Sequence, residues 1–180
     1  MKTKKQSHIM PFLAGFVVTL VIVSLTSFAG ASDRRGRFAL GGALGFMTDT
    51  PDSTAFAVGL SGDYYLTNAF SIGPLLQMGF TGDLFMIAPS AQAKYTFDLG
   101  GIPNLKPYVQ AGIGFIYADL KREGEKDDDT SFIIPFGLGA EYKLTNAISL
   151  DGTVLLNATN LDVRDENLFV TVLFGLKFAF

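Results

Sequence analysis

The chain is poor in the residues on which most enzyme and metal chemistry depends. Cysteine and tryptophan are absent, and His8 is the only histidine among 180 residues. The lack of cysteine excludes a disulfide framework, cysteine-ligated metal sites and a lipid anchor on an N-terminal cysteine. Removal of His8 with an N-terminal leader would also exclude histidine-dependent triads and the usual zinc sites. We therefore expect that the protein is not an enzyme and that it has no cofactor and no metal site.

Charge is scarce as well. Charged residues make up 17% of the chain, which is low for a soluble protein, and acidic residues outnumber basic ones by 17 to 14. The sequence has no basic patch, no glycine-rich phosphate loop and no helical recognition motif. Nucleic acid is therefore not an expected partner.

The longest apolar run lies near the N-terminus. A basic start at residues 2–5 precedes an apolar stretch over residues 12–25, and the small residues 29–31 follow in the A-x-A pattern. This layout is typical of a secretory signal peptide. The sequence predicts a cleaved signal peptide over residues 1–31 and one domain over residues 32–180. The alternative is an uncleaved anchor, because the run nearly reaches the ~20 residues that a membrane-spanning helix needs.

The last thirteen residues alternate strictly in character. From Leu168 to Phe180, every second side chain is a large hydrocarbon, whereas those between are mostly small or polar. This period of two predicts a β-strand with one fully apolar face. Such a strand at a free sheet edge invites aggregation, but in a transmembrane β-barrel the last strand pairs with the first.

Seven further segments alternate in the same way, and their lengths are close to the ~9–11 residues of a tilted transmembrane strand. The sequence therefore predicts an all-β fold, an eight-stranded antiparallel up-and-down transmembrane β-barrel. The expected strands cover residues 37–47, 54–66, 69–79, 84–97, 106–119, 131–143, 147–158 and 168–180.

The opposite strand faces indicate which side meets lipid. On several segments the second face carries mostly glycine and alanine, which suit the crowded lumen of an eight-stranded barrel. A soluble lipocalin-like barrel would instead bury the large residues and expose more threonine, lysine and glutamate. We therefore expect Val109, Ile113 and Phe115 to face lipid. Aromatic residues near the strand ends, Tyr108 among them, are expected in two girdles at the membrane interfaces.

The connections form two sets. One contains residues 67–68, 99–105 and 145–146. Two of these turns lie within an internal repeat, because the sequence of residues 65–72 resembles that of residues 143–150. The other contains residues 48–53, 81–83, 120–130 and 159–167 and carries most of the loop charge. Outer-membrane barrels have short periplasmic turns and longer external loops. We therefore expect acidic external loops, and both termini in the periplasm.

With these features the chain resembles the small eight-stranded outer-membrane β-barrel proteins, a class that includes OmpX-like, OmpW-like and OmpA-transmembrane-like barrels. In that class the barrel-assembly machinery reads a C-terminal signal, and Gly175, Phe178 and Phe180 match it, although Leu173 replaces its polar residue. The resemblance implies location in the bacterial outer membrane as a monomer. The partners that it implies are outer-membrane lipid, lipopolysaccharide and, during biogenesis, the assembly machinery.

Charged residues also fall on the inward stripes, close to the periplasmic strand ends. An isolated ion there would cost several kcal/mol, so these groups should pair or be hydrated. We interpret them as an ion-pair layer that fixes register and closes the lower half of the lumen, and the alternative is a gate in a narrow solute path. The seven residues are Arg37, Asp63, Lys94, Glu141, Lys143, Asp151 and Lys177.

Two functions fit this reading. The first is a structural or surface-interaction barrel that acts through its external loops, and the alternative is a narrow passive channel for small or apolar solutes, as in OmpW-like proteins.

Three prolines are a separate local feature of the sequence. Pro74, Pro89 and Pro135 fall inside expected strands, where each predicts a β-bulge or a locally unpaired carbonyl.

Overall fold

The computed structural model of the chain describes residues 34–50, 53–122, 125–160 and 167–180. The expected signal peptide, residues 1–31, lies outside the described residues, so its cleavage stays a prediction. Among the residues that are described, none belongs to a helix long and apolar enough to cross a membrane.

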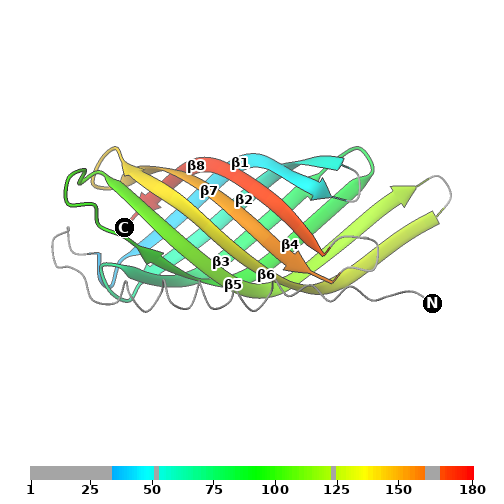
Figure 1. Cartoon of the computed structure of the whole chain (residues 1–180), viewed down its shortest axis with the longest axis horizontal. Helices are drawn as coiled ribbons and strands as arrows, with labels where there is room; N and C mark the ends of the chain where they lie inside the picture. Colours follow the sequence, from blue (N-terminus) through cyan, green and yellow to red (C-terminus); the bar gives the residue numbers. More distant parts are fainter. Residues whose placement is uncertain (1–33, 51–52, 123–124, 161–166) are drawn as a thin grey trace, which may run out of the picture. The chain divides into compact units, whose positions relative to one another are not determined.

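Eight antiparallel strands follow one another around a closed barrel (Figure 1). Each strand pairs with its neighbours in sequence, and β8 returns to pair with β1. The predicted fold class is therefore confirmed. The strands are β1 (Phe38–Thr50), β2 (Ser53–Tyr65), β3 (Phe70–Phe80), β4 (Leu84–Thr96), β5 (Leu105–Arg122), β6 (Glu125–Lys143), β7 (Ile148–Thr159) and β8 (Leu168–Ala179).

The barrel has two ends, which we name by their content. The terminal end is where β1 begins and β8 ends, and the hairpin end is the opposite one, where β5 meets β6. At the terminal end the backbone N–H of Phe180 donates to the carbonyl of Phe38 at 2.8 Å, which closes the seam between β8 and β1. Gly175 lies in this seam, where a Cβ would stand 2.6 Å from Ala43 Cα. The two strands therefore approach too closely there for a larger residue.

The large apolar side chains point outward. Phe115 and Leu138 expose 68% and 64% of their surface, whereas Ile133, on the opposite face of β6, exposes none. Since a water-soluble barrel would bury such residues, this orientation is the one that a lipid environment favours. It matches the expected strand faces along β5, β6 and β8.

The lumen is filled in three zones. Towards the hairpin end a buried apolar cluster includes Met47, Ile116 and Phe169. Next to it, Gln77 donates to Asn157 at 3.0 Å, and Asn157 donates in turn to Thr171 at 2.9 Å. Charged side chains occupy the terminal half. The lumen is therefore more apolar and bulkier than the glycine- and alanine-rich stripes suggested.

The three prolines expected inside strands interrupt the sheet without shifting its register. Pro74 pairs with Ala91 of β4, but the β2–β3 ladder omits its partner on the other side and resumes in the same register. Pro89 and Pro135 show the same pattern towards β5. Because proline has no N–H to donate, one ladder is broken locally. Of the two expected outcomes, the local gap is therefore found at these sites and the β-bulge is not.

The β5–β6 hairpin differs from the expectation. These strands have 18 and 19 residues, whereas the other strands have 11–13, and they extend beyond the rest of the barrel (Figure 1). Their pairing continues until Arg122 lies opposite Glu125. The predicted loop at 120–130 is therefore wrong. Its charge favoured contact with water, a property that does not distinguish a loop from a strand.

The β1–β2 connection is also shorter than expected, because the strands continue to Thr50 and resume at Ser53. The expected turns of the internal repeat are present. In both, a threonine hydroxyl accepts backbone N–H groups two and three residues later: Thr67 from Ala69 and Phe70, and Thr145 from Ala147 and Ile148. Threonine supplies the capping oxygen of each turn.

Candidate functional site

Lys177 is the centre of a buried ion network in the terminal half of the lumen. Its Nζ lies 2.6 Å from Glu141 Oε1 on β6 and 2.9 Å from Asp63 Oδ2 on β2. Asp151 on β7 is at 3.7 Å. Each of these residues stands on the inward face of its strand because side chains alternate with a period of two.

Lys94 on β4 completes the opposite wall. Its Nζ lies 3.1 Å from Asp63 Oδ2, so this carboxylate joins two lysines. The same ammonium group stands 4.4 Å from the centre of the Tyr108 ring, at cation–π distance. The hydroxyl of Ser71 also donates to Asp63, at 3.4 Å. Asp63 therefore receives donors from three strands.

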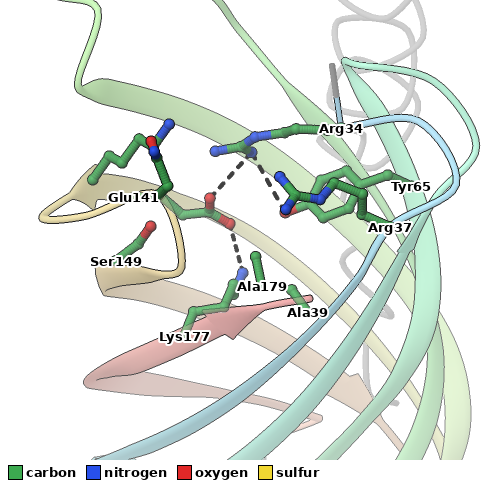
Figure 2. Close-up of a pocket in the computed structure, with 10 residues that line it drawn as sticks. Arg34, Arg37, Ala39, Tyr65, Glu141, Ser149, Lys177 and Ala179 are labelled. Atoms are coloured by element: carbon green, nitrogen blue, oxygen red, sulfur yellow. Dashed lines mark hydrogen bonds and ion pairs between the residues drawn. The ribbon is translucent and has the colours of Figure 1, made fainter. Parts of the chain in front are cut away.

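Arg34 reaches the network from the segment that precedes β1. Its guanidinium lies 3.2 Å from Glu141 Oε2 and donates to Tyr65 Oη at 3.4 Å (Figure 2). The backbone N–H groups of Arg34 and Arg35 donate to Asn68 Oδ1 at 2.8 and 3.3 Å. Asn68 thereby fixes the backbone of residues 34–35, which we call the arm and from which the Arg34 side chain reaches inward. Arg34 was not predicted, because it precedes the alternating segment and no period-two signal marks it.

Tyr108 links the network to the middle of the lumen. Its hydroxyl donates to Asp151 Oδ1 at 3.0 Å and contacts the hydroxyl of Thr153. The ring packs over Gly139, where a Cβ would stand 2.5 Å from Tyr108 Oη. The expected girdle position of Tyr108 is therefore wrong. Its inward-facing neighbours Lys106 and Gln110 share its parity on the strand, and this signal could have placed it.

The network is balanced in charge, with three cations and three carboxylates. We call it the charged layer, and its members are Arg34, Asp63, Lys94, Glu141, Asp151 and Lys177. Four of them expose only 2–3% of their surface. Buried ions of this kind persist when each is paired and hydrogen-bonded, because an unpaired one carries a desolvation penalty of several kcal/mol.

The structure brings together five of the seven predicted layer residues. Arg37 and Lys143 do not join them. Arg37 is exposed and Lys143 half-buried, and both line a pocket at the terminal end. Of the expected assembly signal, Gly175 faces inward at the β1–β8 seam, whereas Phe178 and Phe180 face outward with 44% and 68% of their surface exposed.

Small cavities flank the charged layer. One of about 30 Å³ opens at the terminal end beside Glu141 and Lys177. Another of about 20 Å³ is lined by Gln92, Lys94 and Asp151, and both amide atoms of Gln92 lack a described partner. Cavities of this size hold about one or two water molecules each. The three carboxylates of the layer are engaged by cations or hydroxyl donors, an arrangement suited to cross-linking strands.

The comparisons with known proteins agree with this architecture. The family model for the outer membrane protein beta-barrel domain matches residues 16–178. No curated protein matches the chain.

Solved structures show the same fold at low sequence identity. The N-terminal β-barrel domain of OprF from Pseudomonas aeruginosa is 15% identical with a TM-score of 0.64, and the match covers 83% of this chain and all of that one. Neisserial surface protein A is 20% identical with a TM-score of 0.66, and the match covers 84% of this chain and all of that one. OprG from Pseudomonas aeruginosa is 14% identical with a TM-score of 0.59, and the match covers 81% of this chain and 96% of that one. Together with its closed barrel and outward apolar face, the family match shows that this chain belongs to the outer membrane protein β-barrel family.

Proposed function

We propose that this outer-membrane barrel is a closed structural or surface-interaction protein and that it is not an enzyme. The observation that carries the proposal is the filled lumen. An apolar cluster occupies one half, and the charged layer ties β2, β4, β6, β7 and β8 together in the other. A passive channel would need both zones to open, and breaking a buried ion pair costs about 3–5 kcal/mol.

The projecting β5–β6 hairpin is the feature best placed for surface interaction. Pairing between β6 and β7 ends where Ile133 lies opposite Thr159, so residues 125–132 of β6 pair only with β5. We assign the hairpin end to the outside and both termini to the periplasm. On this assignment the monomeric barrel meets lipopolysaccharide at its hairpin end, lipid along its apolar wall, and the assembly machinery during biogenesis.

Conductance measurements test the closed lumen. We expect the purified barrel in a planar bilayer to show no discrete current steps, because eight strands leave no open aqueous pore once side chains fill it. Reproducible steps in the unaltered protein would overturn the proposal and favour the channel. We expect the double variant Glu141→Ala, Lys177→Ala to stay closed as well, because the apolar cluster still fills the other half of the lumen. Current in this variant alone would identify the charged layer as the barrier.

Cysteine labelling tests the orientation, because the chain has no cysteine of its own. Thr130→Cys places a thiol on the projecting hairpin, and Gly101→Cys places one in the exposed connection between β4 and β5 at the terminal end. A membrane-impermeant maleimide should label intact cells only at position 130. Labelling at position 101 alone would reverse the assignment. Disruption of the outer membrane should make both thiols reactive.

A further inference from the structure

The terminal end of the barrel carries two cations that the charged layer does not need. Three cations already balance three carboxylates within the layer. Arg37 and Lys143 stand outside this balance, and no ion pair joins either side chain to another residue of the described barrel. Both nevertheless line the same pocket, so the pocket has a surplus of positive charge.

The other walls of this pocket supply mainly hydrogen-bond donors. Arg34, Asn146 and Ser149 line it together with Arg37 and Lys143. In Figure 2, Arg34 and Arg37 lie on one side of the pocket, opposite Glu141 and Ser149. Glu141 is the one carboxylate in the lining, and it is already bonded to both Lys177 and Arg34. Its negative charge is thereby neutralised towards the pocket.

We propose that this pocket binds a phosphate group. The surplus of two positive charges matches a phosphate that carries one to two negative charges. Guanidinium groups bind phosphate oxygens through paired N–H donors, and a lysine adds a compact positive charge. The cavity of about 30 Å³ is small, so the phosphate sits at its mouth and displaces the few waters that the cavity holds.

The phosphate can come from either of two sources. Free inorganic phosphate reaches the pocket from solution. An anionic phospholipid can reach it because the pocket lies at the rim of an apolar wall that includes Phe38 and Phe178. That such a lipid belongs to the periplasm-facing leaflet rests on the proposed orientation, whereas binding itself does not.

Titration of the refolded barrel with inorganic phosphate tests the site. The protein is held in a zwitterionic detergent, and amide resonances of Arg37 and Lys143 are followed by NMR. We expect saturable shifts in the unaltered barrel and a loss of affinity of at least about tenfold in the double variant Arg37→Gln, Lys143→Gln, because both positively charged phosphate donors outside the charged layer are lost. Lys106→Gln is the matched control, because Lys106 lies at the same end and pairs with Asp98 outside the pocket.

Nanodiscs of phosphatidylglycerol, compared with nanodiscs of phosphatidylcholine, distinguish the source. Saturable shifts with free phosphate identify the soluble anion, and shifts that need phosphatidylglycerol identify the lipid headgroup; either supports the site. Absence of both overturns the proposal. An equal loss of binding in Lys106→Gln also overturns it, because the effect is then one of general charge. Heat-dependent gel mobility verifies that each variant is folded.

Discussion

Lys177 on β8 and Glu141 on β6 are joined at 2.6 Å although β7 lies between their strands. The bond therefore crosses the lumen and adds to the ladder around the wall. Asp63 on β2, bound by the same ammonium group, extends this link across β1. One side chain thus ties three strands that do not neighbour one another.

Replacement of Lys177 tests how much this link contributes. Lys177→Met leaves Asp63 and Glu141 buried with fewer cations, and we expect the barrel to lose about 3–5 kcal/mol of stability. Urea unfolding in lipid vesicles, followed by circular dichroism, measures the loss. Lys143→Met is the control, because Lys143 is half-buried and outside the charged layer. Equal effects of the two changes would contradict a specific role for Lys177.

A double-mutant cycle isolates the pair. Glu141→Ala leaves the layer with a surplus cation, whereas the combination with Lys177→Ala restores two cations and two carboxylates. We therefore expect the double variant to be more stable than Glu141→Ala alone, which requires a coupling free energy larger than the loss of about 3–5 kcal/mol expected from removing Lys177 by itself. The same urea unfolding assay gives the four free energies. Strictly additive losses would show that the two charges do not interact.

Asn68 holds the arm that carries Arg34 through two backbone N–H groups. Asn68→Ala should speed amide hydrogen exchange at Arg34 and Arg35 and reduce stability by about 0.5–1.5 kcal/mol, the usual value of a hydrogen bond. Asn146 takes the equivalent place in the second copy of the internal repeat, with no such contact to the arm. Asn146→Ala should therefore leave exchange at these two amides unchanged, and faster exchange there would contradict the assignment.

Replacements of Gly175 and Phe180 distinguish effects on the stability of the folded barrel from effects on its assembly in cells. Gly175→Val should hinder closure of the β1–β8 seam, because its Cβ would stand 2.6 Å from Ala43 Cα. We expect lower stability of the barrel refolded in detergent, by about 1–3 kcal/mol as in other overpacked sites. Phe180→Ala should leave this stability nearly unchanged and reduce the amount of barrel in the outer membrane of cells. A normal amount of the Phe180→Ala barrel in the outer membrane would show that Phe180 is not part of the assembly signal.

Much of the fold could be predicted because lipid imposes a strict pattern on a strand. Along Leu168–Phe180 every second residue is large and apolar, and the structure turns these residues outward. Nearness to a strand end predicts Tyr108 in an aromatic girdle, whereas its parity on the strand decides that it faces inward. Arg34 lies before the first strand, where no periodicity applies. Its place depends on Asn68, a tertiary contact that local sequence does not encode.

The location of Lys177 has a consequence for how the molecule is made. It belongs to β8, the strand that seals the cylinder against β1. Without β8, Asp63 keeps only Lys94 as a cation partner and Glu141 only Arg34, so the other seven strands and the segment before β1 hold two cations of the charged layer against three carboxylates. Pairing of β8 with β1 therefore completes both the wall of the barrel and the charge balance of the layer. Closure of the barrel by β8 and neutralisation of the buried carboxylates by Lys177 thus depend on the same strand.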